Sequence, residues 1–181
     1  RYYHTREFQA AVCRWTDKLR AQPERRYALY TEDAYPFAVL LFALLYADKE
    51  VWIPGNNRPG TAGQLKEQGC RLLGDWHEEA VTDYLLNAAP CPDRRLAPLD
   101  PSSAQLVMFT SGSTGEAKPV PKRLIQLQRE AETLEKQWGG QLADAVALAT
   151  VSHQHIYGLL FRILWPLSAG GSSIFPVVLV R

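Results

Sequence analysis

The sequence predicts an α/β fold, in which a mostly parallel sheet is flanked by helices. Short apolar runs with strand character alternate with longer helical patterns along the chain, and this alternation is typical of strand–helix–strand units. Apolar residues make up 46% of the 181 residues, which is enough for a substantial core. The chain contains no internal repeat and no low-complexity tract.

Two strand–helix–strand units are expected in the first part of the chain, and they should form right-handed crossovers. One helix is apolar on all sides, and its Pro36 is tolerated because it falls in the first turn. A capping box at 61–64 opens the next helix, which Gly69 closes. The expected elements are an amphipathic helix over 4–20, strands over 26–31, 50–53 and 70–73, and helices over 34–47 and 61–69.

The second part of the chain follows a proline-rich segment. A helix over 75–89 leads into residues 89–101, whose four prolines indicate a loop or linker. This segment separates a first α/β subdomain portion, 1–100, from a second portion, 102–181. A helix over 122–138 is expected from apolar residues at alternating spacings of three and four. We also expect strands over 106–109, 145–151 and 172–180.

The segment from Val107 to Lys118 is the most informative feature of the chain. An apolar strand runs into a loop of hydroxyl residues and glycines that ends on one lysine. Glycines let backbone N–H groups approach phosphate oxygens, Ser and Thr add donors, and Lys supplies a positive charge. Ser/Gly/Thr clusters also form simple surface turns, but here the unbroken apolar run of 106–109 indicates that the loop leaves from a buried strand. The pattern therefore favours a polyphosphate-binding loop.

Three common motifs do not fit this loop. A P-loop needs Gly-Lys-Ser/Thr at its end, but Ala117 and Pro119 flank the lysine. Pro119 and Pro121 also prevent a helix from starting there and favour an extended exit. The hydrolase motif Gly-x-Ser-x-Gly fails because Ser113 directly follows Gly112. The dinucleotide motif Gly-x-Gly-x-x-Gly fails because the two glycines of the loop are three residues apart.

The loop instead resembles the phosphate-loop signature of the adenylate-forming (AMP-binding) superfamily, which includes acyl-CoA synthetases, aryl-acid ligases and peptide-synthetase adenylation domains. Residues 107–118 satisfy the signature at every position, and Pro119 replaces the glycine that usually follows the lysine. The resemblance implies that the chain is the N-terminal portion of such an enzyme's large domain, without the C-terminal lid domain. We therefore expect a truncated, incomplete part with weak or absent activity alone.

A second segment, 152–171, resembles the next motif of the superfamily, in which His-x-x-Gly begins a helix that lines the acyl pocket. On that alignment His155 is the pocket histidine and Gly158 its partner. His153 and His155 could alternatively form a metal pair if they lay on a strand, but no third ligand of suitable spacing stands out, and we assign no metal site. Tyr157, Phe161 and Trp165 could line the pocket, although core packing explains their helical spacing better.

The resemblance implies the following roles. The protein would use ATP and Mg²⁺ to join a small-molecule carboxylic acid to AMP, release pyrophosphate, and transfer the acyl group to CoA or to the phosphopantetheine of an acyl carrier protein. Lys118 and His155 would be catalytic, and the acyl pocket would include His155, Tyr157 and Gly158. The residues that would hold the β- and γ-phosphates are Thr110, Ser111, Gly112, Ser113, Thr114, Gly115 and Lys118.

Two other functions stay open at this point. A non-catalytic module of the same fold could bind nucleotide or a carrier protein, with Pro119 as a mark of decay. A kinase of α/β fold could also use such a loop, but it would release ADP, whereas adenylation releases pyrophosphate. The acid is not disclosed, so fatty, aryl and amino acids are all candidates.

Composition excludes several other classes. The net charge of +1, with acidic and basic residues interspersed, argues against a nucleic-acid surface or a polybasic membrane anchor. The longest apolar stretch, 34–47, is too short to span a bilayer. Three widely separated cysteines suit reduced thiols better than disulfides. We therefore expect a cytoplasmic protein.

Overall fold

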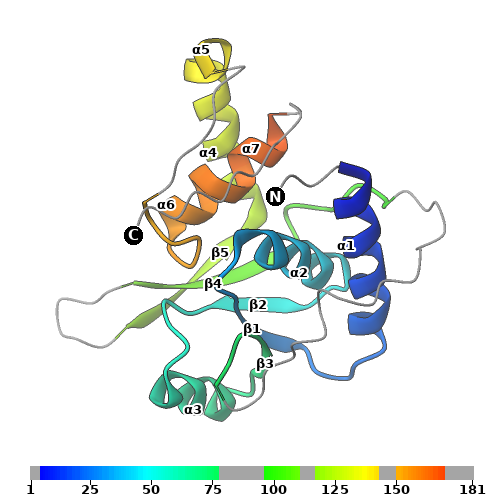
Figure 1. The fold of residues 1–181 in the computed structure, drawn as a ribbon, viewed down its shortest axis with the longest axis vertical. Coiled ribbons are helices and arrows are strands. Elements are labelled where there is room, and N and C mark those ends of the chain that lie inside the picture. The colour runs from blue at the N-terminus through cyan, green and yellow to red at the C-terminus, as the bar shows by residue number, and fades with distance from the viewer. Residues whose placement is uncertain (1–4, 78–95, 111–116, 143–149, 170–181) are drawn as a thin grey trace.

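The computed structural model describes residues 5–77, 96–110, 117–142 and 150–169. Within them, five strands form one sheet in the order β3-β1-β2-β4-β5 (Figure 1). The first four strands are parallel and β5 is antiparallel to β4, which confirms the predicted fold class. The strands are β1 (Arg26–Tyr30), β2 (Glu50–Ile53), β3 (Arg71–Gly74), β4 (Gln105–Thr110) and β5 (Lys118–Arg123).

Helices cover both faces of the sheet (Figure 1). On one face, α1 (Thr5–Arg20) and α2 (Ala34–Tyr46) share a core cluster with α4 (Leu124–Leu134) and with the π-helical stretch Leu159–Leu164. On the other face, α3 (Pro59–Glu67) packs against a second cluster around Trp52 and Trp76. The remaining described helices are a π-helical stretch Glu135–Gly139, α5 (Gly140–Leu142), α6 (Ile156–Gly158) and α7 (Trp165–Ser168).

The predicted elements of the first part of the chain are present with small shifts in their bounds. Helix α2 is apolar on all sides because it is enclosed: ten of its thirteen residues are buried. Gly69 ends α3 with a φ of 76°, and the N–H of Cys70 donates to the Leu65 carbonyl at 3.0 Å. A left-handed glycine followed by this bond is the usual Schellman ending of a helix.

The predicted capping box at 61–64 is wrong. Helix α3 begins at Pro59, so Thr61 already lies within its first turn. The Thr61 hydroxyl donates to Asn56 Oδ1 at 2.7 Å, and the same oxygen accepts the backbone N–H of Arg58 at 3.1 Å. An asparagine in the preceding loop therefore organises the start of this helix, and Pro59 fits because the first helical turn needs no internal N–H donor.

The helix predicted over 122–138 begins two residues late, because residues 122 and 123 still pair with β4. Its apolar stripe is buried at Leu124, Leu127 and Ala131. It reaches the surface at Trp138, which is 40% exposed. The π-helical stretch that starts at Glu135 explains this change, since wider turns rotate later residues away from the stripe.

Other predictions fall wholly or partly outside the described residues. Residues 75–77 form no helix, and 78–89 are not described. In the predicted linker, 96–100 lie outside helices and strands, and 89–95 are not described. Residues 150 and 151 are exposed and not in a strand, which corrects the end of the strand expected over 145–151; the strand over 172–180 is not described.

Strands β2 and β4 join residues before and after the linker in one sheet, and the division into portions stays a prediction. Among the described helices, none is long and apolar enough to cross a membrane.

Candidate functional site at the carboxyl edge of the sheet

The loops that leave β1 and β2 diverge at the carboxyl edge of the sheet. The chain passes from β1 to α2 on one face, and from β2 to α3 on the other face. Strand β3 then returns to the far side of β1, so the strand order reverses between β1 and β2. In open α/β sheets, ligands bind at the carboxyl ends of the strands where the order reverses in this way. A ligand site is therefore expected at this edge of the sheet.

The predicted phosphate loop connects β4 to β5. Thr110 ends β4 and lies opposite Lys118, the first residue of β5, and both residues are exposed. The extended exit predicted after the lysine is confirmed, since β5 runs antiparallel to β4. Pro119 and Pro121 are compatible with this strand because residues two apart direct their backbone N–H positions to the same side, here away from β4. Ser111, Gly112, Ser113, Thr114 and Gly115 lie outside the described residues.

His155 lies at the same edge. It is exposed and precedes α6 as the N-cap residue, with extended backbone angles. A Cβ atom placed on Gly55 would lie 3.4 Å from His155 Cε1, so the imidazole contacts the loop after β2. The predicted start of a helix at the His-x-x-Gly segment is thus confirmed, whereas the pocket role of His155 stays a prediction.

The register between β2 and β4 relates this contact to the phosphate loop. Ile53, the last residue of β2, pairs with Met108, so Gly55 follows β2 at the same edge at which Thr110 ends β4. Neighbouring strands lie about 4.8 Å apart. The imidazole of His155 and the start of the phosphate loop therefore lie at the same edge, at the ends of adjacent strands.

Gly158 is required by close packing. A Cβ atom at this position would lie 2.1 Å from the carbonyl oxygen of Ser152 and 2.9 Å from the backbone nitrogen of His153. Both distances are far below a normal van der Waals contact, so only glycine lets the entering chain pass this close to the helix. The glycine of the His-x-x-Gly motif thus has a structural reason at this position.

His153 and Gln154 connect this segment to the end of β1, a role that the sequence analysis missed. His153 Nε2 and Gln154 Nε2 each lie 2.9 Å from the carbonyl oxygen of Thr31. Since a carbonyl only accepts, both nitrogens donate, and His153 is the neutral tautomer with its proton on Nε2. Burial lowers the pKa of His153 to about 4, and its ring packs on Phe37 with centroids 4.5 Å apart. The only sequence signal is the run of polar residues from Ser152 to His155 before an apolar helix.

The alternative of a metal pair made by His153 and His155 does not fit this arrangement. The segment is not a strand, and His153 is 1% exposed whereas His155 lies at the surface. Across the described ranges, no group of three His, Cys, Asp or Glu residues could hold a metal ion.

The preference for core packing of the helix aromatics is wrong at two of three positions. Tyr157 is 69% exposed and Phe161 is 36% exposed, because Leu159, Ile163 and their neighbours form the buried face of the helix. Trp165 is half-buried, packs edge-on against Phe161 at 5.7 Å, and donates through Nε1 to Glu135 at 2.7 Å. Tyr157 is thus available to a ligand, and its pocket role stays a prediction.

An arginine lies near the loop that follows β1. Arg162, on the helix that follows His155, is half-buried, and burial lowers its pKa while the carboxylate of Asp33 opposes this shift. Asp33 directly precedes α2. The arginine is therefore partly neutralised by an acid of the loop after β1.

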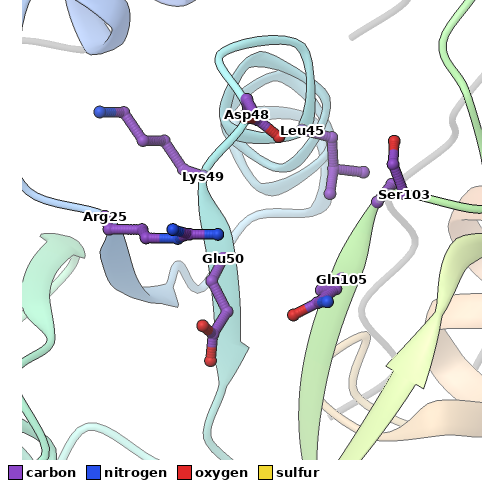
Figure 2. Close-up of a pocket in the computed structure, with 8 residues that line it drawn as sticks. Arg25, Leu45, Asp48, Lys49, Glu50, Ser103 and Gln105 are labelled. Carbon is purple, nitrogen blue, oxygen red and sulfur yellow. The ribbon is translucent and has the colours of Figure 1, made fainter.

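A small hollow lies at the opposite edge of the sheet, away from these residues. Figure 2 shows its lining side chains around the start of β2 and β4, among them Arg25, Lys49, Glu50 and Gln105. Its volume of about 40 Å³ suits one or two water molecules rather than a nucleotide. It does not contribute to the candidate site.

Comparison with known proteins identifies the family of the chain. Residues 3–178 match the family model described as AMP-binding enzyme. A 71-residue stretch is 39% identical to a 4-coumarate–CoA ligase of Rhodobacter capsulatus and covers 39% of this chain and 18% of that protein. A 109-residue stretch is 34% identical to a 2-succinylbenzoate–CoA ligase of Lactococcus lactis and covers 54% of this chain and 24% of that protein. The chain thus spans a quarter or less of these relatives' length.

Two solved structures share the fold. ATP-bound MatB from Rhodopseudomonas palustris has a TM-score of 0.63 at 21% identity, over 91% of this chain and 38% of that one. The O-succinylbenzoate coenzyme A synthetase MenE from Bacillus subtilis, in complex with AMP, has a TM-score of 0.60 at 20% identity, over 85% of this chain and 44% of that one. Because the family model matches nearly the whole chain, the protein belongs to the AMP-binding enzymes, the adenylate-forming superfamily.

Proposed function

We propose that the protein activates a carboxylic acid as an acyl-adenylate, with release of pyrophosphate, and then transfers the acyl group to the thiol of CoA. The observation that supports this proposal is that His155 contacts Gly55, which follows β2, at the same edge at which the adjacent strand β4 ends in Thr110. The hydroxyl- and glycine-rich segment and an exposed imidazole thereby follow adjacent strands of the sheet. Adenylation needs such a pairing, because the triphosphate and the acid must meet at one phosphorus atom.

In this proposal the residues of the loop bind the tail of ATP. Backbone N–H groups and hydroxyls from Thr110 through Gly115 donate to the β- and γ-phosphates, and Lys118 neutralises part of their charge. Mg²⁺ would accompany ATP through its phosphate oxygens. The attacking nucleophile is the carboxylate of the substrate, so the protein's task is to position two anions and to stabilise charge on the departing pyrophosphate.

His155 in this proposal orients the carboxylate beside the α-phosphate. Its imidazole is exposed at the edge, and its backbone is fixed at the start of α6. Tyr157 follows on the same helix and would face the acyl group. Gly158, the other predicted pocket residue, faces the Ser152 carbonyl and would support the pocket through this packing. The phosphopantetheine of a carrier protein is the alternative thiol acceptor. Transfer to CoA is favoured because both related ligases are CoA ligases.

The test is acid-dependent exchange of labelled pyrophosphate into ATP by the full-length protein. The panel of acids begins with 4-coumarate and 2-succinylbenzoate, the acids in the names of the two related ligases, and adds fatty and amino acids. We expect exchange with at least one acid and transfer of the acyl group to CoA. Release of ADP instead of pyrophosphate would indicate a kinase, and ATP binding without any turnover would indicate the non-catalytic module.

Lys118→Ala tests the loop itself. A charge-assisted hydrogen bond contributes about 1.5–3 kcal/mol, so the variant should lose roughly 10- to 100-fold in exchange rate. Lys122→Ala is the matched control, because it removes the same charge from the same strand four residues further from the loop. Equal rates for the two variants would exclude Lys118 from the reaction.

A further inference from the structure

We infer that His153 and Gln154 are positioning residues, which hold His155 at the carboxyl edge through their shared hydrogen bonds to the carbonyl of Thr31. This inference rests on the proposed function, in which His155 orients the acid. The two side chains do not reach the reacting groups themselves. They fix the backbone from which the imidazole of His155 projects.

The hydrogen bonds join distant parts of the chain. Thr31 directly follows β1, whereas His153 and Gln154 are more than 120 residues later. Both lone pairs of one carbonyl oxygen are used, because two nitrogens donate to it at 2.9 Å each. Thr31 is itself held in place, since its hydroxyl donates to the Asp33 carbonyl at 2.8 Å. The segment before His155 is thus attached to a fixed point of the sheet edge.

A tight turn transmits this attachment to His155. The N–H of His155 donates to the Ser152 carbonyl at 3.0 Å, and the N–H of Gln154 lies 3.2 Å from the Ser152 hydroxyl. The same Ser152 carbonyl is the atom against which Gly158 packs. The turn is therefore held on one side by β1 and on the other by the helix. The backbone of His155 is thereby fixed relative to both elements.

Burying His153 and Gln154 has an energetic cost, because each side chain has an acceptor without a donor among the described residues. His153 and Gln154 are 1% and 2% exposed, yet His153 Nδ1 and Gln154 Oε1 have no donor among the described residues. A buried acceptor without a donor destabilises the folded state. Apolar side chains would fill the same space without these unpaired acceptors, but they would leave the buried Thr31 carbonyl without its two donors. The two polar side chains are thus explained by their hydrogen bonds to the Thr31 carbonyl.

The test compares Gln154→Met, His153→Leu and the double variant with the wild type in the full-length protein. Both substitutions keep side-chain volume approximately and remove the donors to Thr31. With the acid that gives the fastest exchange in the wild type, we expect the double variant to lose about 10- to 100-fold in kcat, as for a misplaced reacting group, with the KM for ATP changed less than twofold. His153→Gln retains a donor and should therefore keep a higher kcat than His153→Leu.

Two further measurements separate positioning from loss of stability. Leu65→Ala makes a cavity under α3 on the other face of the sheet, so it should lower the melting temperature and leave kcat unchanged. A crystal structure of the double variant should show His155 displaced from Gly55. A double variant that keeps His155 beside Gly55, or that keeps the wild-type kcat, would overturn the inference.

The outcomes also separate this inference from the proposed function. If no acid supports exchange in the wild type, the proposed function fails, and the crystal structure alone then decides whether the pair positions His155. If the wild type is active and His155 moves without any change in kcat, the proposed function stands and the positioning role fails.

Discussion

Gly158→Ala is the most direct test of how the His155 segment is packed. The added methyl carbon would lie 2.1 Å from the Ser152 carbonyl oxygen, whereas ordinary contacts begin at 3.4 Å. The carbonyl belongs to backbone and cannot rotate away as a side chain could. The chain at residues 152 and 153 would therefore have to move by about 1 Å, as the difference between these distances requires.

The expected cost follows from three contributions. Overpacking of this kind destabilises by about 1–3 kcal/mol. The shift also weakens the bonds of His153 and Gln154 to Thr31, at about 1 kcal/mol each. Alanine recovers about 1 kcal/mol through its higher helix propensity. We expect the free energy of unfolding to fall by about 2–4 kcal/mol, measured by urea denaturation followed by tryptophan fluorescence.

Gly63→Ala is the matched control. Gly63 lies inside α3, and a Cβ atom there would meet nothing within 4 Å. The control should therefore raise the free energy of unfolding by about 1 kcal/mol. Effects of opposite sign are expected from the same substitution in two helices. If Gly158→Ala is as stable as Gly63→Ala, the close approach of Ser152 to the helix is refuted.

Three other predictions concern His153, Cys70 and Asn56. Burial lowers the pKa of His153 from 6.5 to about 4, so the unfolded chain binds the proton first and stability falls by up to about 3 kcal/mol as pH drops through this range. Urea titrations of His153→Leu should lack this part of the acid dependence. Burial raises the pKa of Cys70 to about 11, so mass-spectrometric mapping at pH 8 should find it modified far more slowly in native than in unfolded protein. Asn56→Ala should destabilise by about 1–2 kcal/mol in urea and Thr61→Ala by about 1 kcal/mol, because Asn56 Oδ1 accepts two hydrogen bonds and Thr61 makes one of them.

The elements that the sequence predicts well are those whose pattern is local and continuous. The strand at 50–53 has the predicted bounds, and the apolar helix at 34–47 is one residue shorter in the structure. Pro119 and Pro121 also act locally, because a missing N–H and a fixed φ exclude a helix whatever the surroundings. The family resemblance rests on the same kind of signal, a run of residues within twelve positions.

The features that the sequence does not predict depend on distant partners. Thr61 has the right neighbours for a capping box, but Asn56 in the preceding loop is the residue that meets the helix start. Nothing near His153 indicates that its partner is the Thr31 carbonyl, 122 positions earlier. The exposure of Trp138 follows from a π-helical stretch, which a search for a period of 3.6 residues does not detect.

The charge state of His153 affects where the phosphates of ATP would bind at this edge. A protonated imidazole beneath His155 would attract the phosphates of ATP toward the end of β1 and away from the loop after β4. Burial keeps this ring neutral above about pH 4, and the cation of Arg162 lies near the Asp33 carboxylate. Lys118 is exposed at the hairpin end, and no ion pair holds it within the described part of the chain. Lys118 thereby supplies an exposed positive charge where the proposal places the β- and γ-phosphates, and in that proposal the neutral His153 does not compete with His155 for the carboxylate.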